Sequence, residues 1–271
     1  MSRNQWMEGI TLHSRRFQEY HKQVVLLSRD GGIREAVLHG GYKGRSRHAG
    51  TTEPFRHVKL LLYHNPVRDS WKITDGEVLH PFEGFRGSLP RIYLATLWGE
   101  ILIRTRGGGM GEEGEELFRM VLDCLSLLET AAPEKLVRLN VQFLWRFLAC
   151  TGFAPDVSRC ASCGRTWDEA AGREPLRAVY DTREQGFLCG TCGPAGGASA
   201  GGSGDYLPGS RILLSPGVPR YLDFSLSREV AQGLRASLPP EELALLEKLA
   251  MDFLAAEMEL RPKTPDYRGF L

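Results

Sequence analysis

Four cysteines form the clearest chemical pattern in this sequence of 271 residues. They occur as two Cys-x-x-Cys pairs, Cys160 with Cys163 and Cys189 with Cys192, and 25 residues separate the pairs. Two such pairs can place four thiolates at the corners of a tetrahedron, which is the coordination of Zn²⁺ in structural sites. Four sulfur ligands leave no position open for water. We therefore expect one zinc ion per chain that stabilises the fold and takes no part in catalysis.

Other interpretations of these cysteines stay open, because the same spacing also occurs in redox pairs and by chance. A redox Cys-x-x-Cys is typical of a βαβ setting, which the surrounding sequence does not indicate. Histidine cannot complete the site locally, since all seven histidines lie within residues 13–80. We expect Phe187 and Leu188 to form a small core between the two pairs. Cys124 and Cys150 lie in apolar helical patterns and are expected to be buried, unreactive thiols.

A second pattern is a glycine-rich basic loop over residues 40–48. Its glycines let the backbone approach a polyanion, its cations attract phosphates of any sequence, and its tyrosine can stack on a base. Residues 1–80 support this interpretation, because they hold 13 Lys and Arg against 8 Asp and Glu, a net charge of +5. The alternative is a solvated hairpin tip without a ligand. The candidate DNA-binding residues, with two expected neighbours on the same domain, are Arg34, Tyr42, Lys43, Arg45, Arg47 and Lys59.

Motifs for catalysis or nucleotide hydrolysis are absent or incomplete. The basic loop is not a Walker A loop, because His39 stands where the first glycine is required and Arg45 follows Gly44. Gly-x-Gly-x-x-Gly occurs over residues 109–114, but a helical pattern precedes it and its two glutamates would face a bound pyrophosphate. No His-Glu-x-x-His occurs, and no His-x-Glu accompanies the cysteine pairs. We therefore predict no catalytic residues and no enzymatic activity.

The composition is that of an ordinary globular protein, with 42% apolar residues, 25% charged residues and a net charge of +1. Such a composition excludes a mostly disordered, collagen-like or coiled-coil chain. No run of 18 apolar residues occurs, and the first ten residues lack an apolar signal core. We therefore expect neither a membrane span nor secretion, and we expect a cytoplasmic protein whose cysteines are kept reduced.

Hydrophobic periodicity predicts short strands first and helices afterwards. Five strands, separated by turn signals such as Asp75-Gly76, are expected at residues 9–13, 24–28, 33–38, 58–63 and 71–74. In the fourth of these strands, Val58, Leu60 and Leu62 alternate and are expected to share one face. Five short strands favour a closed barrel, since closure removes exposed edges. Helices are expected at residues 88–101, 117–128, 133–150, 217–224, 228–238 and 241–260.

The fold class is therefore α+β, with an N-terminal barrel, an all-helical domain and an inserted four-cysteine zinc knuckle. The barrel is assigned to residues 1–80 and the zinc-binding insertion to residues 160–193. The helical domain is assigned in two parts, residues 81–159 and 211–271. Residues 194–210, rich in Gly, Ala and Ser, are assigned as a flexible linker because they offer little apolar surface to bury.

Short motifs along nearly the whole chain fit one known family. They are Gly9-Ile10-Thr11-Leu12-His13-Ser14, Gly44-Arg45-Ser46-Arg47, Pro54-Phe55, Gly152-Phe153-Ala154-Pro155-Asp156 before Cys160-x-x-Cys163-Gly164, and Leu213-Leu214-Ser215-Pro216-Gly217. The segment 152–164 with the second cysteine pair is the most specific part. Together these motifs resemble the bacterial RecO family of recombination mediators, which act in DNA repair. The resemblance implies that the barrel is an OB-fold and that the body is helical.

The resemblance also implies an activity and partners. It implies binding of single- and double-stranded DNA, annealing of complementary strands, and a location at the nucleoid. It further implies joint action with RecR and with the C-terminal tail of single-stranded-DNA-binding protein to help load RecA recombinase. A zinc-ribbon adaptor, which binds proteins and has no DNA affinity of its own, is the alternative. A zinc-dependent enzyme would need an open metal position, which four thiolates do not leave.

Overall fold

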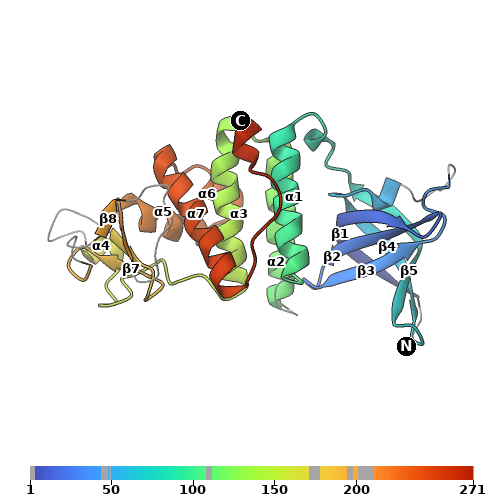
Figure 1. Ribbon diagram of the computed structural model, residues 1–271, viewed down its shortest axis with the longest axis horizontal. Coiled ribbons are helices and arrows are strands. Elements are labelled where there is room, and N and C mark those ends of the chain that lie inside the picture. The colour runs from blue at the N-terminus through green and yellow to red at the C-terminus, as the bar shows by residue number, and fades with distance from the viewer. Residues whose placement is uncertain are drawn as a thin grey trace. The chain divides into compact units, whose positions relative to one another are not determined.

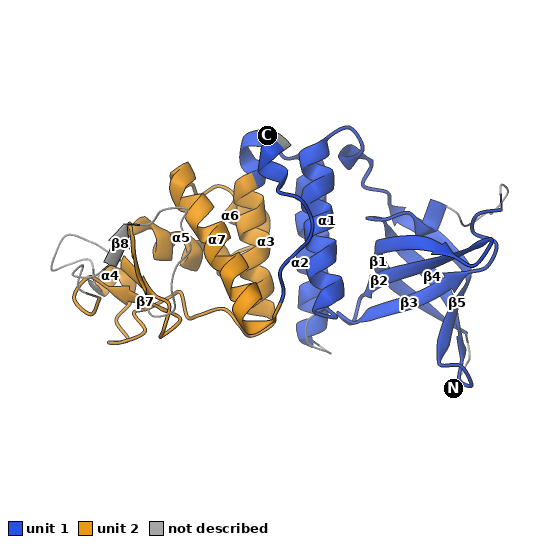
Figure 2. Cartoon of the chain, viewed as in Figure 1, with its two compact units in different colours: residues 1–136, 260–271 blue, residues 137–259 orange. Residues whose placement is uncertain are grey.

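The computed structural model describes residues 4–43, 48, 50–107, 112–170, 178–193, 198–200 and 210–270, with Ala170, residues 198–200 and Phe270 described by their backbone alone. The elements follow one another along the chain as in Figure 1. They form two compact units, residues 1–136 with 260–271 and residues 137–259 (Figure 2). The end of the chain therefore belongs to the first unit.

The N-terminal part of the first unit is a closed barrel of five strands. The strands are β1 (Asn4–Phe17), β2 (His21–Ser28), β3 (Ile33–Leu38), β4 (His57–Asn65) and β5 (Ser70–His80). Their order around the barrel is β1-β2-β3-β5-β4. The pairing of β3 with β5 is parallel, and the other four pairings are antiparallel. The predicted five-stranded barrel is thus confirmed, and its strand order matches an OB-like barrel.

Alternating side chains fill the barrel. The buried cluster consists of Val24, Leu26, Ala36, Leu38, Val58, Leu60, Leu62 and Ile73. The predicted inward face of β4 is confirmed, since its members in this cluster have no exposed surface. A Val, Leu or Ile side chain contributes about 1.5–3 kcal/mol when it is fully buried. The barrel therefore has an apolar core of its own, and its rim is available for polar and charged side chains.

The prediction of a turn at Asp75-Gly76 is wrong, because both residues lie inside β5. Asp75 pairs with Leu61 and Gly76 with Leu60, and the register shifts immediately after Leu61. A Cβ atom on Gly76 would lie 2.6 Å from Cδ2 of Leu60. This glycine therefore serves a close approach at a strand irregularity. β1 is also longer than predicted: one part pairs with β4 and the other with β2.

Two helices complete the first unit, α1 (Leu89–Arg104) and α2 (Glu112–Thr130), with 3₁₀ turns at Gly50–Thr52, Glu83–Phe85, Pro133–Lys135 and Tyr267–Phe270. Gly114 is the last glycine of the Gly-x-Gly-x-x-Gly motif. A Cβ atom on Gly31, in the β2–β3 turn, would lie 2.3 Å from the Cα atom of Gly114. Gly114 therefore packs α2 closely against the barrel. Residues 109–111 of the motif lie outside the described residues.

The second unit combines helices with a small sheet. Its elements are α3 (Leu136–Cys150), α4 (Trp167–Ala170), β6 (Ala178–Asp181), β7 (Gly186–Cys189), β8 (Ala198–Ala200), β9 (Arg211–Leu214), α5 (Gly217–Leu226), α6 (Val230–Gly233) and α7 (Pro240–Glu257). The sheet order is β7-β6-β9-β8. Trp145 of α3 lies at the centre, with its ring 6.0 Å from that of Phe187 and 6.1 Å from that of Phe253. The predicted helical domain with a four-cysteine insertion is confirmed.

One strand of this unit was not predicted, and one helix is shorter than predicted. Residues 211–214 form a strand that pairs with β6, so the cysteine hairpin belongs to a larger sheet than expected. The helix predicted at 228–238 is reduced to the four residues of α6. Gly233 packs so closely on α3 that a Cβ atom there would lie 2.7 Å from Oε1 of Gln142. Nη1 of Arg138 donates to the carbonyl of Leu234 at 2.9 Å. In a longer helix, this carbonyl would instead accept a hydrogen bond from a backbone N–H one turn later.

Candidate metal centre and nucleic-acid interface

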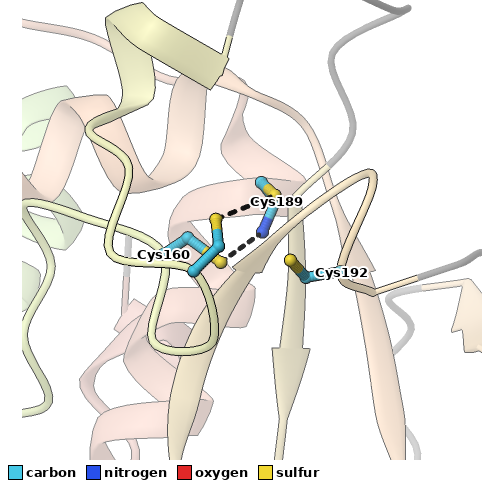
Figure 3. Close-up of side chains that lie close together, drawn as sticks. Cys160, Cys189 and Cys192 are labelled. Atoms are coloured by element: carbon cyan, nitrogen blue, oxygen red, sulfur yellow. Dashed lines mark hydrogen bonds between the residues drawn. The ribbon is translucent and has the colours of Figure 1, made fainter.

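The four predicted metal ligands gather at one end of the β6–β7 hairpin (Figure 3). The Sγ atoms of Cys160, Cys163, Cys189 and Cys192 all lie within 4.8 Å of one another. The distance from Cys163 Sγ to Cys189 Sγ is 3.9 Å. Four sulfurs about 2.3 Å from a central Zn²⁺ are separated by about 3.8 Å when the coordination is tetrahedral. The thiol cluster therefore fits a zinc ion without rearrangement of the backbone.

Two similar turns present the thiols. The N–H of Gly164 donates to the carbonyl of Cys160 at 2.9 Å, and the N–H of Gly193 donates to the carbonyl of Cys189 at 2.8 Å. Gly164 has a φ of 70°, a left-handed conformation that favours glycine. The N–H of Cys189 donates to Cys160 Sγ at 3.3 Å, as dashed in Figure 3. Backbone donors of this kind stabilise the thiolate form that a metal requires.

The electrostatic settings of the thiols differ. A hydrogen bond from Nε of Arg165, 3.4 Å from Cys163 Sγ, lowers the pKa of the Cys163 thiol to about 6. Burial raises the pKa of Cys192 to about 12. Cys163 is thus ready to ligate as a thiolate at neutral pH. Cys192 gives up its proton only to a cation that binds its sulfur directly.

The hairpin is supported by the aromatic core of its own unit. Phe187 is fully buried and Leu188 nearly so, which confirms the predicted small core.

The two cysteines outside the cluster differ in burial. Cys124 is buried as predicted, and its sulfur lies 3.7 Å from that of Met120. The prediction of burial is wrong for Cys150, which is only partly covered because it ends α3.

The basic loop begins where β3 ends, at the rim of the barrel. Tyr42 and Lys43 are exposed there, whereas Arg45 and Arg47 lie outside the described residues. The N–H of Tyr42 donates to the carbonyl of Tyr20 at 3.1 Å, so the loop is fixed to the β1–β2 turn. Nζ of Lys43 lies 5.7 Å from the ring centroid of Tyr20. The loop and this turn therefore form one surface.

Two further cations extend this surface. The guanidinium carbon of Arg16 and Nζ of Lys22 each lie 5.8 Å from the ring centroid of Tyr42. We call the set Arg16, Tyr20, Lys22, Tyr42 and Lys43 the rim platform. Its tyrosines are 48% and 46% exposed, which leaves ring surface for a partner. Sequence reasoning missed three members, although the basic and aromatic residues around the β1–β2 turn carried a detectable signal.

Lys22 has a different role from the other cations of the rim platform. It is only 4% exposed, and its Nζ lies 2.9 Å from Oε1 of Glu53. That carboxylate offsets its charge, so Lys22 positions Tyr42 and adds little attraction for a distant anion. Arg16 and Lys43 are the exposed cations among the described members of the rim platform.

The other two predicted DNA-binding residues lie elsewhere on the barrel. Arg34 pairs with Leu26 in the strand register, whereas the basic loop follows Leu38, which pairs with Lys22. Nη2 of Arg34 also lies 2.9 Å from Oδ2 of Asp30, which offsets its charge. Lys59 of β4 stands between two carboxylates on neighbouring strands, Glu8 and Glu77, with its Nζ 5.6 Å from the ring of Trp6.

Comparison with known proteins decides the family. Residues 1–82 match the model "Recombination protein O N terminal", and residues 86–265 match "Recombination protein O C terminal". The chain belongs to the RecO family. The DNA repair protein RecO of Symbiobacterium thermophilum is 28% identical over 89% of this chain and 92% of its own length. That of Nocardioides sp. strain JS614 is 30% identical over 79% of this chain and 87% of its own length.

Membership of the RecO family confirms the resemblance and places the chain among DNA repair and recombination proteins. The N-terminal family match ends just after β5, and the C-terminal match begins just before α1. The rim platform therefore lies in the RecO N-terminal region and the thiol cluster in the C-terminal region. Within the described ranges, every helix is too short or too polar to cross a bilayer.

Proposed function

We propose that this RecO family member is a recombination mediator that binds single- and double-stranded DNA through the rim platform. This proposal rests on one observation, the pair of exposed tyrosines flanked by cations at one end of the barrel. Arginine and lysine attract phosphates of any sequence, and aromatic rings stack on any base. The platform therefore supports binding without base specificity. Arg45, Arg47, Arg34 and Lys59 remain proposed phosphate contacts.

The same surface supports the proposal that the protein anneals complementary strands without making or breaking bonds. Two single strands repel each other through their phosphates, and a protein that covers one strand with cations lowers this repulsion. The sequence contains no Walker A loop, and Gly114 of the Gly-x-Gly-x-x-Gly motif packs against Gly31. We therefore propose annealing of complementary strands that needs no ATP, by a protein that is not an enzyme.

Family membership supports the proposed partners. We propose that the protein acts with RecR and with the C-terminal tail of single-stranded-DNA-binding protein to help load RecA on coated strands, at the nucleoid in the cytoplasm. The thiol cluster is proposed to hold one structural Zn²⁺, because its sulfur separations fit tetrahedral coordination. When bound, zinc would cross-link the two turns, and Cys160, Cys163, Cys189 and Cys192 would hold it.

The test of this function is fluorescence-quench annealing of two complementary oligonucleotides, bare and coated with single-stranded-DNA-binding protein, with and without ATP. We expect acceleration over the spontaneous rate on bare strands, without any need for ATP. A rate no faster than the spontaneous one, or strict dependence on ATP, contradicts the mediator. The adaptor without DNA affinity would then be the better account.

Charge-matched variants locate the binding surface. The triple change Lys43→Ala, Arg45→Ala and Arg47→Ala should weaken binding equally for all sequences. For single strands it should lower the slope of log affinity against log salt by about 0.7 per lost phosphate contact. The control removes the exposed cations Arg119, Arg183 and Arg235, which lie outside the barrel. Equal effects of both triple variants would show that only overall charge matters.

A further inference from the structure

Two histidines form a hydrogen-bonded pair beside the rim platform. His21 begins β2 and His39 follows β3, and their rings meet edge to face with centroids 4.4 Å apart. His39 Nδ1 lies 3.3 Å from His21 Nε2. The N–H of Gly40 donates to His21 Nδ1 at 3.1 Å. The pair therefore connects the start of the basic loop to the start of β2.

These two contacts fix the protons of the neutral pair. His21 Nδ1 accepts from Gly40, so the proton of neutral His21 must be on Nε2. That proton is donated to His39 Nδ1, and the remaining proton of His39 is on its Nε2. Adding one proton to the pair destroys one contact. Either two N–H groups then face each other between the rings, or a proton on His21 Nδ1 faces the N–H of Gly40.

The surroundings also oppose a positive charge on the free pair. Burial, His21 and Lys72 of β5 together lower the pKa of His39. Lys43 lies close by, since its Cδ is 3.5 Å from where a Cβ of Gly40 would be. Lys22 similarly approaches Gly41, with Glu53 as its carboxylate partner. The charged groups nearest the pair are thus mainly cations, an arrangement that a bound phosphate would reverse.

We propose that His21 and His39 are a proton-coupled phosphate contact within the nucleic-acid interface. His39 is exposed and follows a strand that ends at the rim platform. An imidazolium there donates to a phosphate oxygen, which replaces the contact that protonation destroys. This inference rests on the proposed function, because it assigns a regulation to the same surface.

Proton linkage gives the direction of the effect. His39 is neutral in the free protein at pH 7, and a phosphate beside it raises its pKa. Binding then takes up a proton at pH values between the free and bound pKa values. Affinity should therefore rise as pH falls through the bound-state pKa, and level off below the free-state pKa. For one proton the limit is about tenfold per pH unit.

The experiment measures affinity of the full chain for a single-stranded oligonucleotide at pH values from 8 to 6 and constant salt. The wild-type chain should bind about 3–10-fold more tightly at pH 6 than at pH 8, which lies within the limit for one proton. His39→Gln should flatten this dependence. His39→Arg, with a fixed charge, should bind at pH 8 nearly as tightly as the wild type does at pH 6. The control is His64→Asn, because His64 is bound to Asp69 at the β4–β5 turn.

Imidazole NMR titration of His39 provides an independent readout, since its pKa should be higher with the oligonucleotide than without it. Wild type and His39→Gln share the other six histidines, so the difference between their binding curves reports the pair. Binding with the same pH dependence in wild type and His39→Gln overturns this inference and leaves the proposed function intact. Failure of the wild type to bind at any pH overturns both.

Discussion

The barrel and the four-cysteine hairpin hold their shapes by different means. The barrel closes on itself around buried aliphatic side chains, and its rim platform takes no part in that core. The hairpin consists of two strands of four residues, and the four sulfurs at its end are those that we propose a metal joins. Binding residues on a self-supporting core can be replaced without unfolding it. Residues that ligate a structural metal cannot.

Removal of the metal ligands should have the largest effect. The double change Cys160→Ser and Cys189→Ser leaves two thiols, so we expect loss of zinc and of the amide protection in β6, β7 and β9. Zinc binding contributes on the order of 10 kcal/mol in isolated finger peptides, and we expect several kcal/mol here. Zinc analysis and hydrogen exchange measure both effects.

The control for this variant is Cys150→Ser, which changes a partly covered thiol outside the cluster. It should keep one zinc per chain and wild-type exchange in the hairpin. Full protection of β6 and β7 in the double variant, without bound metal, would show that the hairpin needs no ion.

Truncation in the barrel core should have the next largest effect. Leu60 is fully buried, so Leu60→Ala should lower the free energy of unfolding by about 2–5 kcal/mol and leave the zinc content unchanged. Leu79→Ala is the control, since Leu79 is 44% exposed on β5 and should change stability by less than about 0.5 kcal/mol. Denaturant unfolding of both variants is the measurement. Equal midpoints would contradict a self-supporting apolar barrel.

Loss of the rim tyrosines should change binding and leave the fold intact. Tyr20→Ala and Tyr42→Ala should each weaken binding of a single strand by about 1–3 kcal/mol if a base stacks on the ring. Tyr20→Phe and Tyr42→Phe keep the aromatic face and should bind nearly as the wild type does. Fluorescence anisotropy with a labelled oligonucleotide is the measurement. Wild-type affinity in both alanine variants would remove stacking from the account.

Replacement of Arg165 should have the smallest effect. Without its hydrogen bond, the pKa of Cys163 should rise from about 6 toward the ordinary thiol value. Arg165→Gln should therefore weaken zinc binding about tenfold near pH 7. The loss should grow as pH falls toward 6 and vanish above pH 9, where the thiol ionises in either chain. Chelator competition across this range is the measurement, with Arg159→Gln as control; parallel curves would exclude this role.

The sequence predicted those features that repeat along the chain or depend on spacing. Alternation in β4 indicated the barrel core, and the two Cys-x-x-Cys pairs indicated the cluster, because each pattern fixes its own local geometry. Asp75-Gly76 was wrongly predicted to be a turn. A glycine that makes room for a side chain of the neighbouring strand, as Gly76 does for Leu60, cannot be told from a turn glycine by its local sequence. The strand at 211–214 was missed because its partner, β6, is distant in sequence.

The candidate interface was predicted only in part for the same reason. Tyr42 and Lys43 stood out within one loop, whereas Arg16 and Tyr20 join them only through the packing of the β1–β2 turn on that loop. The ion pair in which Asp30 offsets the charge of Arg34 was also not predicted. The two residues are only four apart, but opposite charges at that spacing often remain solvated instead of pairing. Contacts between segments distant in sequence thus decide which residues belong to the candidate interface, and local sequence patterns do not contain that information.

Hydrogen exchange of the full chain, with and without a saturating thymidine oligonucleotide, tests the central claim most directly. The rim platform predicts protection by the oligonucleotide in residues 16–22 and 38–43, with exchange in residues 160–193 unchanged. Protection confined to residues 160–193 would contradict a binding barrel and a purely structural metal centre.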